Sequence, residues 1–303
     1  MNLQQKIAAG KFVITAEVTP PVTFSRDELL DKALPLKGLA DAVNITDGAG
    51  ARPHMSALIS ATLLAQNGME PVLQLTCRDR NRIALQSELM GAAAVGIRNI
   101  LALRGDDPTA GDQPETKPVF DLDSRGLLET ARRMRDQGEL PNGKPVSGHA
   151  EFFLGTADSP IDPPAGWEPK SLAGKVASGA QFAQTQFCMD AGVACRYIAR
   201  LAEHGLDRKL PLLIGIAPLR SAKSARWMKE KLFGTIMPDA VIDRMEKAAD
   251  PVAEGIRVAV DLIAEISQIP NIGGVHIMAP NNDEALPIVI GEARKCLKQK
   301  TMA

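Results

Sequence analysis

The stretch R-N-I-L-A-L-R-G-D-D-P at residues 98–108 changes character abruptly after Leu103. The residues from Ile100 to Leu103 are apolar, as expected of a strand that is covered on both faces. An arginine, a glycine and two adjacent aspartates follow at once. Such a strand either turns out to solvent or reaches a site at the carboxyl edge of a parallel sheet.

Short apolar runs of this kind alternate with longer helical patterns through all 303 residues. The apolar runs predict strands at 12–18, 41–46, 71–77, 98–104, 145–151, 182–187, 211–218 and 273–279. The helical patterns between and after them lie at 25–38, 54–68, 80–96, 124–137, 170–179, 190–205, 221–231, 238–247, 250–268 and 282–299.

Eight strands, each followed by a helix, predict a single (β/α)8 TIM barrel over residues 1–303. We expect one domain, with the active site at the carboxyl ends of the strands. A doubly wound open sheet is the alternative. That fold usually has a glycine-rich phosphate loop after its first strand, whereas E-V-T-P-P stands at 17–21 here.

Composition restricts the classes of partner. The formal net charge is −1, which gives no support for a nucleic-acid or anionic-membrane partner. Apolar runs are too short for a membrane span, and the first residues lack the layout of a signal peptide. The cysteines form no C-x-x-C pair, and no metal-ligand spacing occurs, so we expect a cytoplasmic protein without a metal site. The cysteines are Cys77, Cys188, Cys195 and Cys296.

Polar side chains follow most of the predicted strands. Because parallel strands bring their carboxyl ends to one face of a barrel, we expect these side chains to gather at one site. The residues at these strand ends, most of them polar, are Glu17; Thr46 and Asp47; Gln74 and Thr76; Arg104, Gly105 and Asp106; His149 and Glu151; Gln184 and Gln186; His276, Met278, Asn281 and Asn282.

Two interpretations are open for the acidic residues of this set. A carboxylate inside an apolar strand is costly unless it is paired or protonated. Glu17 therefore either pairs with a cation, such as Arg104, or holds a proton as an acid. Asp106 and Asp107 precede a proline and could both be turn residues, which is the interpretation that we favour for Asp107.

Structural roles compete with functional ones at other positions too. His149 is equally compatible with a functional role and with a hydrogen-bonded histidine in the core, and His276 is expected to be structural. Met228 lies on a helical pattern typical of a core residue. Lys175 lies in a short helix, where solvent exposure is the default.

Five motifs in series resemble the methylenetetrahydrofolate reductase family, over nearly the whole chain. They are A-E-V-T-P-P at 16–21, N-I-T-D-G-A at 44–49, Q-L-T-C at 74–77, A-L-R-G-D at 102–106 and Q-T-Q-F at 184–187. The resemblance implies a (β/α)8 barrel that binds FAD along the strand ends. It also implies reduction of 5,10-methylenetetrahydrofolate to 5-methyltetrahydrofolate by NADH or NADPH, at one shared site.

The resemblance assigns roles by motif. Glu17 matches the general acid, and Asp106 matches the aspartate near the flavin and the folate. Arg104 and Lys175 match the pair that meets the FAD phosphates, and Gly105 would let the backbone approach the flavin. The implied cofactor-binding set is Thr46, Gln74, Arg104, Gly105, Phe120, His149, Glu151, Glu168, Lys175 and Ala180. The implied substrate-binding set is Gln186, Met228, Met278 and Asn282.

Several of these positions depart from the family pattern. Gln74 replaces a histidine, His149 and Phe120 stand near tyrosines of relatives, and Glu168 replaces an aspartate. Met228 replaces a phenylalanine that stacks on substrate. The remaining departures are Val18-Thr19 for two phenylalanines, Met278 for a tyrosine and Asn282 for an arginine.

The acid and the aspartate are therefore retained while the pocket walls differ. A flavin-independent reductase, a non-catalytic folate- or flavin-binding barrel and a different barrel enzyme such as a lyase are the alternatives. The same site could also run in reverse and oxidise methyltetrahydrofolate. Relatives assemble as dimers or tetramers, which implies a homo-oligomer.

Overall fold

Eight parallel strands close into a barrel in the computed structural model, which describes residues 1–302. Each strand pairs with its neighbours in chain order, and the last pairs with the first, with Ile14 opposite Val275. The predicted TIM barrel is confirmed, and the open sheet is excluded. The strands are β1 (Val13–Val18), β2 (Ala42–Ile45), β3 (Pro71–Thr76), β4 (Asn99–Leu103), β5 (Phe153–Asp158), β6 (Phe182–Phe187), β7 (Leu212–Ile216) and β8 (Gly274–Ile277).

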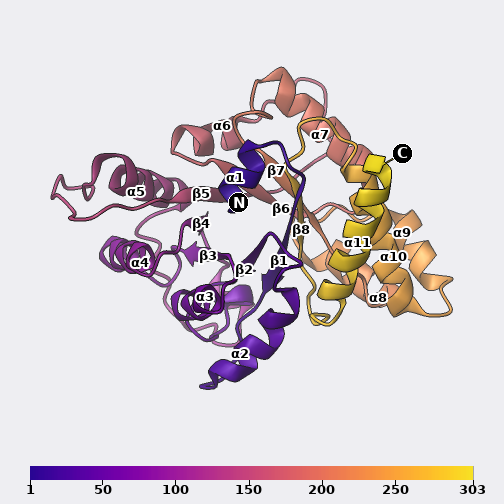
Figure 1. Cartoon of the computed structure of the whole chain (residues 1–303), viewed down its shortest axis with the longest axis horizontal. Coiled ribbons are helices and arrows are strands. Elements are labelled where there is room, and N and C mark those ends of the chain that lie inside the picture. The colour runs from indigo at the N-terminus through magenta and orange to yellow at the C-terminus, as the bar shows by residue number, and fades with distance from the viewer. Residues whose placement is uncertain (303) are drawn as a thin grey trace.

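Helices surround the strands, and the first helix lies across the middle of the barrel (Figure 1). Three helices separate β7 from β8, and Asp250 caps the last of them. The helices are α1 (Leu3–Ala8), α2 (Arg26–Ala33), α3 (Ala57–Gln66), α4 (Arg82–Ala94), α5 (Ser124–Gln137), α6 (Lys170–Ala177), α7 (Ala191–Glu203), α8 (Ala222–Lys231), α9 (Asp239–Glu246), α10 (Pro251–Ile266) and α11 (Ala285–Met302). Short 3₁₀ turns lie at Leu34–Leu36, Ala49–Ala51 and Pro108–Ala110.

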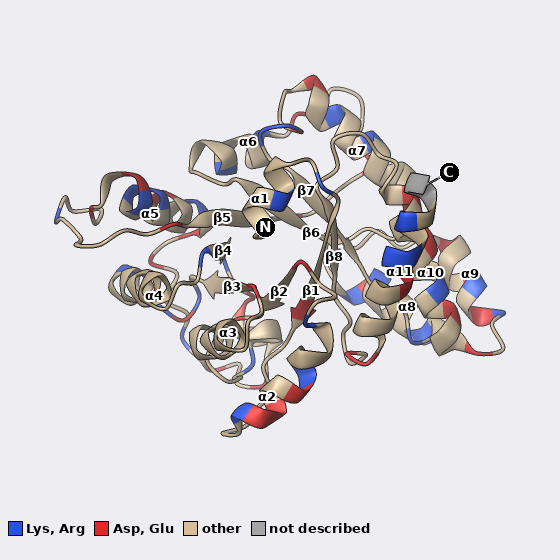
Figure 2. Ribbon diagram, in the orientation of Figure 1, with Lys and Arg blue, Asp and Glu red and all other residues tan. Residues whose placement is uncertain are grey.

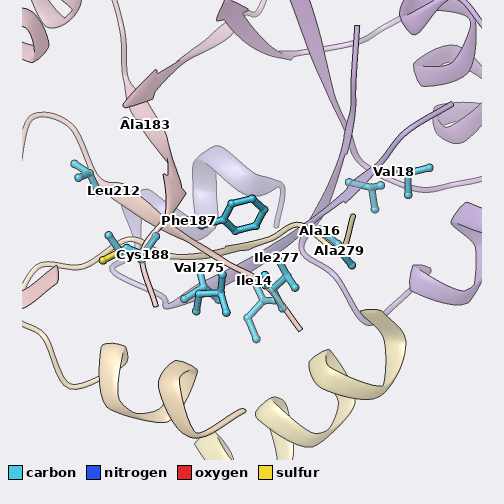
Figure 3. Close-up of a cluster of buried hydrophobic side chains, with 14 of the residues drawn as sticks. Ile14, Ala16, Val18, Ala183, Phe187, Cys188, Leu212, Val275, Ile277 and Ala279 are labelled. Atoms are coloured by element: carbon cyan, nitrogen blue, oxygen red, sulfur yellow. The ribbon is translucent and has the colours of Figure 1, made fainter. Parts of the chain in front are cut away.

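Alternation along the strands builds two apolar layers. Side chains that point outward, such as Ile14, Val275 and Ile277, pack against the helices (Figure 3). Side chains that point inward near the amino ends form a second cluster, in which the rings of Phe153 and Phe182 stack with centroids 4.7 Å apart. Successive side chains of a strand point to opposite faces, so a parallel sheet that is buried on both faces needs apolar residues at both sets of positions.

The fifth strand differs from the prediction. It is Phe153–Asp158, not 145–151. The predicted segment is mostly exposed and follows a tight turn in which Glu139 and Pro145 form an antiparallel bridge. The strand itself is buried over its first four residues and pairs Phe153 with Asn99. Burial of the apolar residues 152–154 therefore outweighs the β-propensity of the earlier segment.

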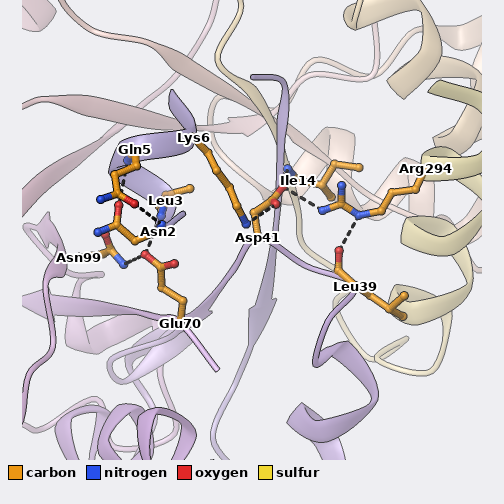
Figure 4. A network of polar contacts seen from close by, with 10 residues as sticks. All are labelled: Asn2, Leu3, Gln5, Lys6, Ile14, Leu39, Asp41, Glu70, Asn99 and Arg294. Carbon is orange, nitrogen blue, oxygen red and sulfur yellow. Dashed lines mark hydrogen bonds and ion pairs between the residues drawn. The ribbon is translucent and has the colours of Figure 1, made fainter. Parts of the chain in front are cut away.

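The amino end of the barrel is closed by α1. Leu3 is fully buried against the first residues of the strands, and its backbone N–H donates to Glu70 Oε1 at 2.8 Å. Lys6 and Arg294 both pair with Asp41, at 2.8 and 2.9 Å, and so tie α1 and α11 to the loop before β2 (Figure 4). Apolar packing and ion pairs therefore close the amino end of the barrel.

Charged side chains are concentrated on the helices and loops around the barrel, and the strands carry few of them (Figure 2). Across residues 1–302, none of the helices has the length and apolar character needed to cross a bilayer.

Candidate active site

A layer of buried polar side chains lies inside the barrel, above the apolar layer. Thr15, Asn44, Gln184 and His276 point inward from β1, β2, β6 and β8. Asn44 and Gln184 exchange two amide hydrogen bonds, at 2.6 and 3.0 Å, and Gln184 Nε2 also donates to Thr15 Oγ1 at 3.1 Å. Barrel interiors are usually filled by branched apolar side chains, so this layer marks the base of a functional site.

Glu17 lies on the same face of β1, two residues beyond Thr15. Its Oε2 accepts a hydrogen bond from Gln74 Nε2 at 2.7 Å and lies 3.6 Å from His276 Nε2. The side chain is 22% exposed, so it faces the mouth of the barrel. Of the two interpretations, pairing with Arg104 is wrong, because the partners of Glu17 come from β3 and β8.

Two polar side chains at the end of β2 differ in their hydrogen bonding: Asp47 has several partners and Thr46 has none among the described residues. Asp47 accepts from the Thr76 hydroxyl at 2.8 Å and from Arg80 at 2.7 and 3.1 Å. Thr46 Oγ1 is buried without a hydrogen-bond partner among the described residues. Buried hydroxyls are rarely left unpaired, so Thr46 is available for a ligand at this face.

The end of β4 separates the two aspartates of R-G-D-D-P. Asp107 accepts from the backbone N–H and the hydroxyl of Thr109, at 2.9 and 2.6 Å, which confirms the turn interpretation. These bonds hold the pKa of Asp107 below its ordinary value. Asp106 is exposed, and its Oδ2 accepts from the Gly50 backbone N–H at 3.0 Å, while Oδ1 has no hydrogen-bond partner within the described part of the chain.

Gly105 is required by its own backbone and by its neighbours. Its φ is +93°, and a Cβ there would lie 2.9 Å from Arg78 Cβ and 3.2 Å from Thr76 Cβ. The glycine therefore allows β4 to end close against the residues that follow β3.

Arg104 points away from Glu17. Its guanidinium lies 4.6 Å from the centroid of the Phe120 ring, a cation–π contact. Phe120 has a φ of +41°, and its N–H donates to Cys77 O, so the loop after β4 folds back over the end of β3. Arg104 and Phe120 thus form one wall of the site.

A hollow of about 390 Å³ lies beside the end of β5 and is bordered by α6. Lys175 reaches into it and donates to Ala157 O at 2.6 Å, so the expected solvated lysine is wrong. Burial lowers the pKa of Lys175, although Asp158 opposes this shift. Glu168 lines the same hollow.

Asp158 and Tyr197 complete this hollow and were not predicted. Tyr197 Oη donates to Asp158 Oδ2 at 2.7 Å, and the Trp167 ring lies 5.4 Å from the Tyr197 ring. Burial raises the pKa of Asp158, against the opposing effects of Tyr197 and Lys175. The sequence signal was present: placing the strand at F-L-G-T-A-D would have put Asp158 at its carboxyl end.

The proposed substrate-binding residues divide into two groups. Gln186 is half-buried at the end of β6, Met278 is half-buried just after β8, and Asn282 donates to Pro218 O at 3.1 Å. These three lie at the site. Met228 is only 4% exposed within α8 and packs in the helix layer, as its helical pattern predicts for a core residue.

Three predicted cofactor residues lie at the opposite end of the barrel. His149 and Glu151 precede β5, and Glu151 pairs with Arg98, just before β4, at 2.6 Å. Ala180 precedes β6 and is buried next to Gln181, whose N–H donates to Leu154 O at 2.7 Å. The assignment of these three residues to cofactor binding is therefore wrong. His149 and Glu151 were assigned because the fifth strand was predicted too early in the chain, and Ala180 follows α6, at the amino end of the barrel. Among residues 1–302, no cluster of three or more metal-ligating side chains occurs.

The chain is thus a closed (β/α)8 barrel with Glu17, Thr46 and Asp106 at the carboxyl ends of β1, β2 and β4. Residues 2–294 match the sequence profile described as methylenetetrahydrofolate reductase, and the chain belongs to this family.

Relatives agree with this membership. Methylenetetrahydrofolate reductase 2 of Schizosaccharomyces pombe is 27% identical over 96% of this chain, which spans 46% of that protein. The 5,10-methylenetetrahydrofolate reductase of Escherichia coli K12 is 26% identical over 88% of this chain and 86% of its own length. That of Salmonella typhimurium is 28% identical over 74% and 71%.

Solved structures share the fold. A Clostridium thermocellum protein, described as binding two copies of 5-methyl-5,6,7,8-tetrahydrofolic acid, superimposes with a TM-score of 0.69 at 14% identity, covering 97% of this chain and 98% of its own. The EDTA monooxygenase of Chelativorans sp. BNC1 gives a TM-score of 0.59 at 11% identity, covering 95% and 94%.

Proposed function

We propose that this protein reduces 5,10-methylenetetrahydrofolate to 5-methyltetrahydrofolate, with FAD as cofactor and NADH or NADPH as electron donor. The observation that carries the proposal is Glu17, an acid at the mouth of the barrel with one oxygen held by Gln74 and the other without a partner among residues 1–302. Family membership and the folate-binding neighbour of the same fold support it.

The donor set fits FAD. The unpaired hydroxyl of Thr46 offers a hydrogen bond, and Lys175 uses one of its three N–H groups on Ala157 O, so it can still donate to a phosphate. Arg104 supplies a second, exposed cation. These residues would hold the cofactor along the ends of β2, β4 and β5, with Gln74, Gly105, Phe120 and Glu168 in the surrounding walls. When bound, FAD would supply hydride transfer between the nicotinamide and the folate.

Glu17 would act as the general acid. Opening the five-membered ring of the folate needs a proton at the leaving nitrogen, and a positioned carboxylic acid supplies one in the transition state. The carboxyl group of Glu17 is partly buried, and Gln74 fixes one of its oxygens. The other oxygen is therefore the one that can hold and deliver the proton.

Asp106 would stabilise the cation that ring opening leaves on the folate. A carboxylate about 4 Å from an iminium contributes about 4 kcal/mol at an effective dielectric constant of about 20. The bond from Gly50 fixes one oxygen of Asp106 before substrate arrives, so little reorganisation is needed. Gln186, Met278 and Asn282 would line the folate side of the pocket.

The test combines a spectrum with an assay. Purified protein, alone or after addition of FAD, should absorb at about 450 nm, and the band should bleach with NADH or NADPH and return with methylenetetrahydrofolate. Folate reduction by protein that stays colourless and ignores FAD would replace this proposal with the flavin-independent reductase. Folate binding without turnover would favour the non-catalytic barrel, and a protein that binds no folate would belong to another class of barrel enzyme.

A further inference from the structure

His276 is a buried ionisable side chain to which the proposed chemistry gives no role. It is 2% exposed, and its ring stands between the polar layer of the barrel and Glu17. We propose that His276 is a positioning residue for the acid: its Nε2–H holds Oε2 of Glu17 so that the proton to be delivered is carried on Oε1. The inference rests on the proposed function, in which Glu17 is the general acid.

The neighbours of Nδ1 determine which ring nitrogen carries the hydrogen. Thr15 Oγ1 lies 2.9 Å from Nδ1, and its other acceptor, Val275 O, is more distant, at 3.4 Å. Gln184 Nε2 donates its two hydrogens to Asn44 Oδ1 and Thr15 Oγ1, so the Thr15 hydroxyl accepts from Gln184 and gives its own hydrogen to the nearer acceptor, Nδ1. Nδ1 therefore accepts from the Thr15 hydroxyl, which places the hydrogen of the neutral ring on Nε2.

The same reasoning applies to the carboxyl group of Glu17. Oε2 faces two N–H groups, that of Gln74 at 2.7 Å and that of His276 at 3.6 Å. A proton on Oε2 would point at these donors, so the proton of the acid form is placed on Oε1, which has no partner within residues 1–302. Removing either donor would allow the carboxyl group to rotate and hold its proton on the wrong oxygen.

The surroundings of His276 make this arrangement specific. Within the described part of the chain, the groups facing the ring are Thr15 from β1, Gln184 from β6 and Glu17, which is the single charged one. The contact between Glu17 and His276 joins β1 to β8, and the Gln74 contact joins β1 to β3. The acid is thus held by side chains from two other strands.

Two substitutions distinguish this role from simple packing. Glutamine at 276 places an N–H near the position of Nε2, whereas asparagine reaches only the position of Nδ1. We expect H276Q to keep kcat within about threefold of wild type and H276N to lose about tenfold, as for a neutral hydrogen bond that tightens from 3.6 Å in the reacting complex. KM for the folate should change little, and the limb of the kcat–pH profile on which kcat falls as the pH rises should move in H276N alone.

A matched pair of threonine variants provides the control. T15V removes the hydroxyl that faces Nδ1 and should also lower kcat. T156V makes the same change at a fully buried position of β5, outside the polar layer, and should leave kcat unchanged. Circular dichroism and the unfolding midpoint establish that each variant is folded.

Nitrogen-15 NMR of the histidine rings tests the arrangement without turnover, with H276N assigning the signal. Wild type should show the Nε2–H tautomer, and T15V should show a mixture. An Nδ1–H tautomer in wild type, or H276N as active as H276Q, would overturn the inference. Wild-type protein that fails to turn over the folate would overturn the proposed function instead, while the tautomer still decides the inference about His276.

Discussion

The two ends of the barrel use polar side chains in opposite ways. At the amino end, Asp41 has its charge compensated by Lys6, Arg294 and the Ile14 N–H, and Leu3 fills the opening. At the carboxyl end, Thr46 has no partner among the described residues, and Glu17 has one oxygen without a partner.

This difference shows how one scaffold separates stability from chemistry. A satisfied buried network and a filled core contribute to the free energy of folding. Groups left unsatisfied at a pocket cost stability, and they persist where a ligand completes them. Substitutions at the amino end should therefore change the stability of the protein, and substitutions at the carboxyl end should change its activity.

The largest effect is expected from E17Q. The amide cannot supply the proton that ring opening needs, so kcat for folate reduction should fall by about 10²–10⁴-fold with the unfolding midpoint nearly unchanged. Steady-state kinetics and chemical unfolding of the same preparation measure both. E139Q, at a surface ion pair near the amino end, is the control and should leave both unchanged. Unchanged turnover in E17Q would remove Glu17 as the acid.

D106N and D107N compare adjacent aspartates with different roles. D106N removes the negative charge that would face the iminium in the proposed reaction, and kcat should fall by up to about 10³-fold, the equivalent of about 4 kcal/mol. D107N only weakens the turn with Thr109 and should retain wild-type kcat. Equal losses in both variants would show that the loop, not the charge on Asp106, is responsible.

L3A tests the amino end. Removing a fully buried leucine should lower the free energy of unfolding by about 2–5 kcal/mol, while kcat per folded molecule stays unchanged. Denaturant unfolding and an active-site titration separate the two quantities. Q4A, at an exposed position of the same helix, is the matched control. A loss of kcat in L3A alone would mean that the two ends are coupled.

D41N should give the smallest effect, and one that depends on pH. Burial raises the pKa of Asp41, but the bonds from Lys6, the Ile14 N–H and Arg294 outweigh it and hold the pKa below its ordinary value. The stabilisation is therefore complete above the ordinary aspartate pKa of about 4 and is lost as the pH falls through the lower native value.

Unfolding curves of wild type and D41N at a series of pH values measure this effect. The difference between them should be about 1–3 kcal/mol at pH 7 and should shrink steadily below pH 4. A difference that is constant down to the acid transition would contradict the role of the Asp41 charge.

The barrel and the position of Glu17 at a strand end could be predicted from sequence because both depend on local signals. Apolar runs of strand length, each ending in polar residues, specify the alternation of strands and helices and the place of Glu17 and Asp106. Strand 5 could not be located in this way, because two adjacent segments both resemble strands and only the pairing of Phe153 with Asn99 selects between them.

The partners of Glu17 were beyond prediction for a different reason. Gln74 lies 57 residues away, and His276 belongs to the last strand, so their contact depends on the register of the whole barrel. The sequence signals an acid in need of a partner, and Arg104 was a reasonable candidate by charge. Arg104 instead stacks on Phe120, whose φ is positive. The partners of Glu17 are therefore the Gln74 amide and the His276 imidazole.

The pairing of β8 with β1 has a kinetic consequence. Thr15 and His276 touch although they are 261 positions apart, so the polar layer forms only when the ring of strands closes. Contacts of such long range are slow to form, because the loop entropy is lost before the contact stabilises it. A refolding chain with native-like helices but without the β1–β8 pairing would lack the contact between Glu17 and His276. The recovery of catalysis should therefore lag behind the recovery of helical circular dichroism and report on the pairing of β1 with β8.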